Sequence, residues 1–399
     1  MTSLIARARS AGALNPTRAV QDGEVVLEVC FGAHSADHES LLGELIDDLR
    51  GTASPDDALS ELVRLAREHS DIIADILTDA TKRALLLRII GASGALADIA
   101  LRDPQVLTGL DRVEQTLISP FTFAPHPDSF PAAVTALRAQ YRRHLWAIAA
   151  ADLAMDDYRT MPSVAQAITR LVHETLRVGL HLARREHPET NDALIVVALG
   201  KSGGMELNYI SDVDIICVSK SEQSADLAAV STVVKTLRDI CSHRIVGVDE
   251  VPLWPLDMNL RPEGRDGPLV KTLSAHRHYY AKWAETWEFQ ALLKARPIAG
   301  DQELQTAYET EIWPRAFHAV ERENFVADTQ HMRMRVEASL TRNERGRHIK
   351  LGAGGLRDVE FTVQLLQLVH ARTDATLRRR GTIPAISALC AGGYISREA

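Results

Sequence analysis

Two aspartates separated by one residue carry the clearest chemical signal in the sequence. They are Asp212 and Asp214, in the apolar segment DVDIICV. Alternate residues of a β-strand lie on the same face, so a strand here would hold both carboxylates together and direct Val213 and Ile215 into the core. Two neighbouring carboxylates do not both stay ionised cheaply without a cation between them, and Mg²⁺ is the usual oxygen-bound cation of phosphoryl chemistry. The pair therefore predicts a divalent-metal site; the alternative is a pair of exposed acids in a turn.

A glycine-rich segment, LGKSGG, precedes the aspartates and allows two interpretations. Gly200-Lys201-Ser202 has the form of the end of a P-loop, but a P-loop also needs a glycine at position 195. The residue there is Ile195, inside the strand-like run ALIVVALG, so the P-loop is rejected. Gly203 and Gly204 instead predict a tight turn whose backbone can approach a phosphate closely. Lys201 remains as a phosphate contact.

A third carboxylate is expected to complete the site. Asp257 is the candidate, because it ends a proline-flanked segment that suits a short or edge strand. Arg261 follows it and offers a guanidinium to a phosphate or carboxylate. Ser211, directly before the first aspartate, completes the set near the glycines.

Downstream, the sequence predicts one long helix from Ser274 to Arg296. Four apolar residues recur in it at helical spacing and predict core packing: Tyr280, Trp283, Trp287 and Ala291. Lys294 continues this stripe, and Arg296 follows. A cation there either meets a nucleotide phosphate or satisfies the helix dipole, and the sequence leaves both open. Both residues are included as candidate phosphate-binding groups.

The elements that must position these residues divide the chain into three predicted parts. Residues 1–190 predict amphipathic helices, 191–300 predict strands and helices around the candidate site, and 301–399 predict helices again. The last part is interrupted by the glycine-rich KLGAGGLRDVEF. Gly352 to Glu360 could contact a ligand, but a structural role is favoured. Arg378-Arg379-Arg380 predicts an exposed charge run.

Composition limits the partners. The 399 residues are 46% hydrophobic and 25% charged, with a formal net charge of −8, which argues against a nucleic-acid partner. Four cysteines without CxxC spacing predict reduced thiols, and no segment has the pattern of a signal peptide or membrane span, so we expect a cytoplasmic protein without a membrane partner. The pairs His34 with His38 and His276 with His278 lack the further ligands that zinc needs.

Four ordered segments resemble one known family. GKSGGMELNYISDVDIICV, LDMNLRPEGRDGPLV, AETWEFQALLKARPIAGD and KLGAGGLRDVEFTVQLLQL are similar to the glutamine synthetase adenylyltransferase/adenylyl-removing enzymes, strongly over residues 190–399. The resemblance implies an α+β fold, with a polymerase-β-like nucleotidyltransferase domain between helical domains. It places Asp212, Asp214 and Asp257 on the family's metal-binding carboxylates, and Gly203 and Gly204 on its phosphate-binding turn.

The resemblance also implies a reaction and partners. Each of two similar halves of these enzymes transfers AMP: one attaches it from ATP to a tyrosine of glutamine synthetase, and the other removes it by phosphorolysis, releasing ADP. The arginine of GGLRDVEF, the initial methionine and the long helical segment before the motif favour the deadenylylating, amino-terminal half of a longer chain. Its expected partners are glutamine synthetase, the carboxyl-terminal half and a PII-type signalling protein. Asn259 departs from the family's arginine, which puts a phosphate contact there in doubt.

The resulting hypothesis is a magnesium-dependent phosphorolysis. Asp212, Asp214 and Asp257 are expected to hold two Mg²⁺ ions, one orienting phosphate and one stabilising the leaving tyrosinate. The neighbouring cations would neutralise phosphate oxygens: Lys201, Arg261, Lys294 and Arg296. The rivals are the adenylylating half, which would share the metal ligands, a non-catalytic scaffold, and a polynucleotide nucleotidyltransferase, which the acidic composition disfavours.

Overall fold

The computed structural model describes residues 2–32, 36–111, 113–124, 127–155, 157–190, 192–321 and 347–396, with Ala327 and Met334. They form two compact units, one of residues 1–123 and 139–171 and the other of residues 124–138 and 172–399. The division falls inside two long helices, α9 (Phe130–Met155) and α10 (Met161–Glu186). It does not coincide with the predicted boundaries at residues 190 and 300.

The first unit is helical. Its elements before α9 are α1 (Thr2–Ser10), α2 (Pro16–Phe31), α3 (Ala36–Asp48), η1 (Leu49–Gly51), α4 (Pro55–Glu68), α5 (Ser70–Thr78), α6 (Ala80–Ala92), α7 (Gly94–Arg102), η2 (Pro104–Asp111) and α8 (Val113–Thr116), and η3 (Tyr158–Thr160) precedes α10. Leu59, Leu62 and Leu65 on one face of α4 are fully buried in a core shared with α2 and α6. Among the described helices none is by itself long and apolar enough to cross a membrane; α6 and α7 reach that size only together, across a 117° bend.

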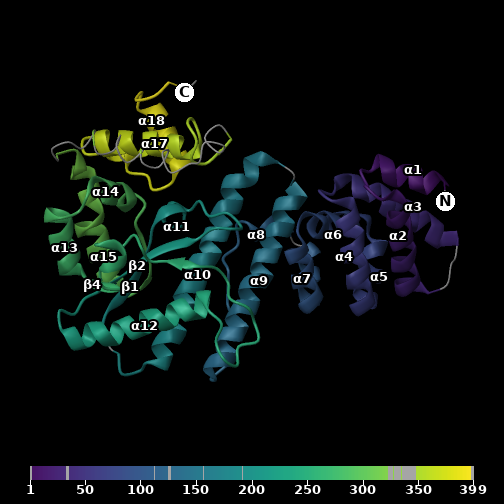
Figure 1. Ribbon diagram of the computed structural model, residues 1–399, viewed down its shortest axis with the longest axis horizontal. Helices are drawn as coiled ribbons and strands as arrows, with labels where there is room; N and C mark the ends of the chain where they lie inside the picture. The colour runs from purple at the N-terminus through teal and green to yellow at the C-terminus, as the bar shows by residue number, and fades with distance from the viewer. Residues whose placement is uncertain are drawn as a thin grey trace. The chain divides into compact units, whose positions relative to one another are not determined.

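The second unit is built on a mixed five-stranded sheet (Figure 1). Its strands are β1 (Leu194–Ala198), β2 (Val213–Ser219), β3 (Leu256–Asp257), β4 (Val270–Thr272) and β5 (Arg296–Gly300). β1 lies between β2 and β5 and is antiparallel to both, while β3 and then β4 pair in parallel with the other edge of β2. The predicted α+β fold with a small mixed sheet is confirmed.

Helices bury the sheet. They are α11 (Gly200–Gly204), α12 (Ser224–Ser242), α13 (Leu273–Lys282), α14 (Thr286–Leu292), α15 (Gln302–Glu311), α17 (Leu356–His370) and α18 (Thr382–Ala391), with the 3₁₀ segments η4 (Gly264–Asp266), η5 (Trp313–Glu321) and η6 (Ala375–Leu377). In Figure 1, α12 runs below the sheet, and α17 and α18 lie above α14. Ile195 and Ile216 pack in one core with side chains of α13 to α18, including Tyr308 and Leu389. Residues 301–321 and 347–396 therefore share their core with the sheet.

The predicted helix from Ser274 to Arg296 is wrong. The chain leaves the helix at Trp283, whose side chain is exposed, and starts α14 with a capping box in which Glu285 and Glu288 each bond the other's backbone N–H. Arg296 begins β5 instead of ending a helix. Of the predicted stripe, Tyr280 is buried, Trp283 is exposed, and Trp287 and Ala291 are partly buried. Tyr280, Ala284, Phe289, Leu292 and Leu293 form the core here.

The cysteines agree with the prediction of reduced thiols. All four are unpaired, and Cys217 and Cys241 are buried. Burial raises the pKa of each of these two thiols to about 12, so both stay protonated at neutral pH.

Gly203 offers a test of how tightly α11 is packed. A Cβ added there would lie 1.9 Å from the carbonyl oxygen of Lys294 and 2.7 Å from that of Ala198. We expect Gly203→Ala to lower the free energy of unfolding by roughly 1–3 kcal/mol or more, because backbone atoms cannot move aside as a flexible side chain does. Chemical denaturation measures this. Gly109→Ala, which meets no atom within 4 Å, is the control; equal stability of the two variants would contradict the packing.

Candidate active site

The three predicted aspartates meet at one end of the parallel pair β2 and β3. Asp214 and Asp257 are direct partners in the register of these strands, and Asp212 directly precedes β2. Val213 and Ile215 are buried, as the alternation predicted. Burial and the neighbouring Asp257 and Asp212 raise the pKa of Asp214 to about 6. The carboxylates are thus close enough to repel one another.

Short-range backbone contacts orient these carboxylates. The N–H of Asn259 donates to Oδ1 of Asp257 at 2.7 Å, a contact that any residue except proline could make. The N–H of Leu199 donates to the carbonyl of Asp214 at 2.9 Å and joins the end of β1 to the site. The family's arginine at position 259 is therefore not needed to hold Asp257.

The predicted glycine turn is a one-turn helix, α11, wedged behind Asp214. A Cβ on Gly200, whose φ is +49°, would lie 2.2 Å from Oδ2 of Asp214. Gly203 and Gly204 are buried and approach protein backbone, Gly203 at Lys294 and Gly204 at Arg380. The N–H of Gly203 donates to Leu199 within the helix. The two glycines are thus needed because the backbone of α11 lies close to other backbone segments of the protein. Their predicted contact with phosphate remains a prediction.

Two of the other predicted residues face each other beside the aspartates. Nζ of Lys201 donates to Oγ of Ser211 at 3.2 Å, and this hydroxyl donates to Oδ1 of Asn208 at 2.8 Å. The positive charge of Lys201 opposes the rise in the pKa of Asp214. Lys201 is therefore placed where a phosphate near the aspartates would need a cation.

Arg261 stabilises its own loop. Its guanidinium donates to the carbonyls of Met258, Gly267 and Arg265, at 2.8, 3.1 and 3.0 Å respectively. These bonds use a donor on each of its three nitrogens. The arrangement favours a structural role over the predicted phosphate contact.

Lys294 lies at the centre of a buried ion network. Its Nζ donates to Glu206 at 3.1 Å, to Glu360 at 2.5 Å and to Thr382 Oγ1 at 3.2 Å, and the residue is only 4% exposed. Burial lowers the pKa of Lys294, but the two carboxylates outweigh it and raise the pKa. An ammonium has three N–H donors, and all three have protein acceptors here. The arrangement therefore favours a structural role over the predicted phosphate contact.

Arg296 also serves the helix behind the aspartates. Its Nε donates to the carbonyl of Gly203 at 2.9 Å, and burial, then Arg380, lowers its pKa. From α10, His173 also contacts this helix: its Nε2 lies 3.2 Å from both the carbonyl and Oγ of Ser202 in α11. Burial, then Arg296, lowers the pKa of His173 to about 4, so this imidazole is neutral at physiological pH. Arg296 and His173 both position α11.

The arginine run was predicted to be exposed, and for Arg380 this is wrong. Its Nε donates to the carbonyl of Ala295, its Nη2 pairs with Glu309 at 2.5 Å, and its guanidinium lies 3.9 Å from the centre of the Trp313 ring. Arg378 likewise donates to Ala371. Arg380 thus connects α15 and the residue before β5 to the segment before α18, and Arg378 binds the end of α17.

The glycine-rich segment to which the sequence assigned no chemistry brings a further lysine to the site. Lys350, at the start of KLGAGGLRDVEF, lies close enough to Asp214 that its charge opposes the rise in that carboxyl's pKa. Ten residues later, Glu360 binds Lys294. Lys350 was missed because no local pattern indicates a contact across more than a hundred residues; a lysine before a glycine turn was the only signal.

The donor chemistry of the aspartates fits a divalent cation. Among the described residues, no three of His, Cys, Asp or Glu converge closely enough to enclose a metal ion as they stand. Burial first, and then Asp257 and Asp212, disfavour the ionised form of Asp214 and raise its pKa, and a cation bound to all three carboxylates would offset this penalty. The histidines give no rival site in the described part of the chain: His276 is a core residue whose Nδ1 contacts the carbonyl of Thr272, and His34 lies outside that part.

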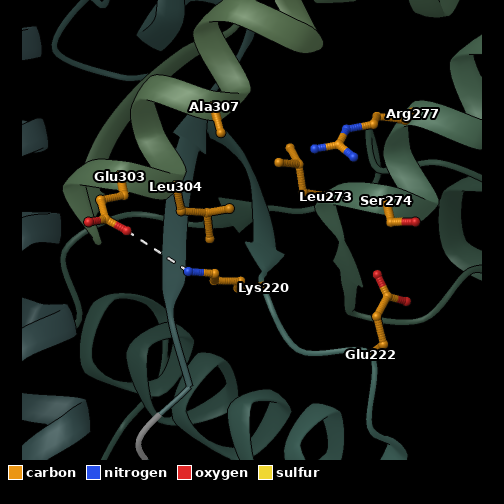
Figure 2. Close-up of a pocket in the computed structure, with 8 residues that line it drawn as sticks. All are labelled: Lys220, Glu222, Leu273, Ser274, Arg277, Glu303, Leu304 and Ala307. Carbon is orange, nitrogen blue, oxygen red and sulfur yellow. Dashed lines mark ion pairs between the residues drawn. The ribbon is translucent and has the colours of Figure 1, made fainter.

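A separate pocket of about 330 Å³ lies at the opposite end of β2 (Figure 2). Leu273 and Leu304 project into it, and charged residues stand around them. Nζ of Lys220 lies 3.9 Å from Glu303, while Arg277 pairs with Glu311. Its two basic groups therefore already have acidic partners, and the pocket is distinct from the aspartates.

Comparisons with known proteins agree with the motifs. Residues 83–311 match the family model of glutamate-ammonia ligase adenylyltransferase, and residues 330–399 match that of GlnD PII-uridylyltransferase. Similar proteins named bifunctional glutamine synthetase adenylyltransferase/adenylyl-removing enzyme include those of Streptomyces avermitilis, 44% identical over 88% of this chain and 36% of the relative, and Bifidobacterium longum subsp. infantis, 40% identical over 92% and 37%. Another, from Mycobacterium bovis, is 39% identical over 89% and 36%. The chain spans just over a third of the length of these curated relatives.

The raised pKa of Asp214 predicts a pH-dependent stability. Its ordinary pKa is 3.8 and its folded pKa is about 6. The folded state therefore binds this proton more tightly, and the free energy of unfolding falls as the pH rises from about 4 to about 6. At pH 7.5 without divalent cations, we expect Asp214→Asn to be more stable than the unmodified chain by about 2 kcal/mol.

Thermal unfolding with and without millimolar Mg²⁺ checks this prediction. Mg²⁺ should raise the melting temperature of the unmodified chain and have a much smaller effect on Asp214→Asn, because the variant lacks one carboxylate ligand. A lower stability of Asp214→Asn at pH 7.5 would contradict the raised pKa that burial and the neighbouring aspartates give Asp214.

The ion network around Lys294 predicts a large loss of stability on its removal. Lys294→Met would leave Glu206 and Glu360 facing each other without a cation. We expect the free energy of unfolding to fall by about 3–5 kcal/mol. Chemical denaturation measures this, with Lys220→Met as the control, because its exposed ion pair should be worth less than about 1 kcal/mol. Equal effects of the two substitutions would contradict a stabilising role of this ion network.

Proposed function

Because the chain belongs to the glutamate-ammonia ligase adenylyltransferase family, we propose that it is a Mg²⁺-dependent nucleotidyltransferase that acts on glutamine synthetase. Its reaction is the removal of AMP from a tyrosine of that enzyme by phosphorolysis, which gives ADP and active glutamine synthetase. The observation that carries this proposal is the meeting of three carboxylates at the ends of β2 and β3, with Asp214 and Asp257 in direct register.

The aspartates supply the metal site of this proposal. Asp212, Asp214 and Asp257 would together hold two Mg²⁺ ions. Bound there, Mg²⁺ neutralises the charge of phosphate oxygens and of the leaving oxygen. The protein's own part is to hold the carboxylates together, through the β2–β3 register, the N–H of Asn259 and the wedge of α11.

The proposed step balances without a further reactant. An oxygen of inorganic phosphate forms a bond to the phosphorus of the AMP group, and the bond between this phosphorus and the tyrosine oxygen breaks. The tyrosine oxygen takes up the proton lost by the phosphate, and the products are ADP and free tyrosine. A phosphate nucleophile is already ionised, so positioning and charge neutralisation are the main requirements. Lys201 is a cation beside the aspartates that supplies such charge.

The direction of transfer has a second candidate. Attachment of AMP from ATP to glutamine synthetase, releasing pyrophosphate, would use the same three aspartates. The resemblance of GGLRDVEF, with Arg357, to the first half of the family favours removal. A non-catalytic scaffold is disfavoured, because such a protein has no need to hold three mutually repelling carboxylates together.

The proposed partners follow from the same family membership. Glutamine synthetase is the protein substrate, and the remaining part of a longer chain would carry the opposing activity. The match of residues 330–399 to a PII-uridylyltransferase model supports a PII-type protein as regulator. The proposed compartment is the cytoplasm, where glutamine synthetase and nucleotides are available to it.

The decisive assay uses adenylylated glutamine synthetase, phosphate and Mg²⁺. ADP should appear as the mass of the AMP group is lost from glutamine synthetase. Replacing Asp212, Asp214 or Asp257 with asparagine should lower the rate by roughly 10²–10³-fold or more, because the charge that binds Mg²⁺ is reduced without a change in shape.

Two controls identify the reaction. Asp266→Asn, in η4, removes one acidic charge outside the aspartate cluster and should leave the rate unchanged. Pyrophosphate release from ATP and unmodified glutamine synthetase would identify the adenylylating reaction instead. Near-normal rates in the three aspartate variants would rule out the site.

A further inference from the structure

The loop between α11 and β2 carries exposed apolar residues directly before the aspartates. Ile210 is 91% exposed, and its neighbour Tyr209 is exposed as well. Ile210 precedes Asp212 by two residues, so the Cα atoms of these two residues are at most about 7 Å apart. Single exposed apolar residues are common on protein surfaces and carry no function by themselves. What distinguishes Ile210 is its position beside the candidate metal site.

Contacts on both sides of these two apolar residues hold the loop in place. Before them, the N–H of Glu206 donates to the carbonyl of Lys201 at 2.8 Å, and the side chain of Leu207 is buried. After them, Oγ of Ser211 donates to Oδ1 of Asn208 at 2.8 Å, and this bond closes the loop across the apolar pair. The pair therefore lies at the tip of a loop whose shape is set by its own polar residues.

A second group of exposed apolar residues lies on α17. Leu356 and Val359 are 66% and 47% exposed, in the first turn of this helix. The next residue, Glu360, accepts a hydrogen bond from Nζ of Lys294 at 2.5 Å, and the same ammonium donates to Glu206 at 3.1 Å. The residue that begins the loop and the exposed turn of α17 are therefore joined through one ammonium group. Apolar side chains are thus exposed on two connected segments.

A protein surface fits these residues better than a nucleotide does. Binding sites for small molecules are concave and bury most of the ligand. Ile210 is instead almost fully exposed at a loop tip, a shape that a partner protein can cover. The proposed reaction also requires a second protein to bring its modified tyrosine to the aspartates. The segment that carries this tyrosine must therefore pass over the residues beside them.

We propose that Ile210 and Tyr209 contact the protein substrate beside its modified tyrosine, and that Leu356 and Val359 extend this contact surface. The occupant is the segment of glutamine synthetase on either side of that tyrosine, so the inference rests on the proposed function for its partner. Burial of apolar side chains adds affinity for the protein substrate without a contact to phosphate or Mg²⁺. The surface therefore determines recognition of the protein substrate and leaves the chemical step to the aspartates.

Steady-state kinetics tests this contact. Ile210→Ser should raise the Michaelis constant for adenylylated glutamine synthetase about tenfold, because the apolar contact is lost. The Michaelis constant for phosphate and the turnover number at saturating substrate should not change. Ile210→Val should retain most of the affinity. Val246→Ser is the matched control, because Val246 is 96% exposed in a turn beside Pro131 of α9. Equal effects of Ile210→Ser and Val246→Ser would overturn the proposal.

Direct binding separates the competing occupants. Surface plasmon resonance with immobilised glutamine synthetase should show about tenfold weaker binding of Ile210→Ser and a smaller loss for Leu356→Ser. Equilibrium dialysis with labelled ADP and Mg²⁺ should show no change in either variant. Weaker ADP binding would assign the loop to the nucleotide, and an altered sedimentation coefficient of the chain alone would assign it to a second copy. Either result would overturn the proposal, as would unchanged binding of glutamine synthetase.

The two levels of inference fail differently. If the unmodified chain binds glutamine synthetase but releases no ADP from its adenylylated form, the proposed reaction is wrong and Ile210 is still judged by binding. If the chain releases ADP and Ile210→Ser has the Michaelis constant of the unmodified chain for adenylylated glutamine synthetase, the reaction stands and the role of Ile210 is overturned. A chain that neither binds glutamine synthetase nor releases ADP would overturn both.

Discussion

The site depends on a five-residue helix that has no room for side chains on two sides. At Gly200 an added Cβ would lie 2.2 Å from a carboxylate oxygen of Asp214, and at Gly203 it would lie 1.9 Å from the carbonyl of Lys294. Three segments, the end of β1, the start of β2 and the approach to β5, therefore meet at backbone distance. Without this contact the carboxylate of Asp214 would not be packed against α11. Gly200 and Gly203 are thus required for the packing of the protein itself.

Charge is distributed differently on the two sides of that helix. Behind it, Lys294 is balanced by Glu206 and Glu360, and Arg380 by Glu309, so basic groups there stabilise the fold. In front of it, the aspartates repel one another, and Lys201 and Lys350 only partly offset this repulsion. An excess of negative charge at a partly buried position is costly to an unliganded protein. The same excess is what a divalent cation with a nucleotide requires, so the cost is concentrated where binding can remove it.

The parts of the site that the sequence predicts are the local ones. Asp214, its strand and the neighbouring Asp212 follow from alternation and β-branched residues, and Asp257 follows from its place at the end of a proline-flanked segment. The predicted helix from Ser274 to Arg296 is wrong because apolar residues at helical spacing continue through Trp283, whereas the capping box at Glu285 starts a new helix.

The roles of the cations were not predictable in the same way, because their partners are distant in sequence. Glu206 and Glu360 lie 88 and 66 residues from Lys294, and no spacing rule relates them. That ion network shows that the last part of the chain supports the region behind the aspartates. Residues 301–321 and 347–396 contribute to the core beside the sheet, and Thr382 and Glu360 hold Lys294 behind α11. The described residues of the segment matched by the second family model thus pack against the sheet that lies within the first. The mixed sheet supplies the carboxylates of Asp214 and Asp257, and the helices after it support the helix α11 that lies behind them.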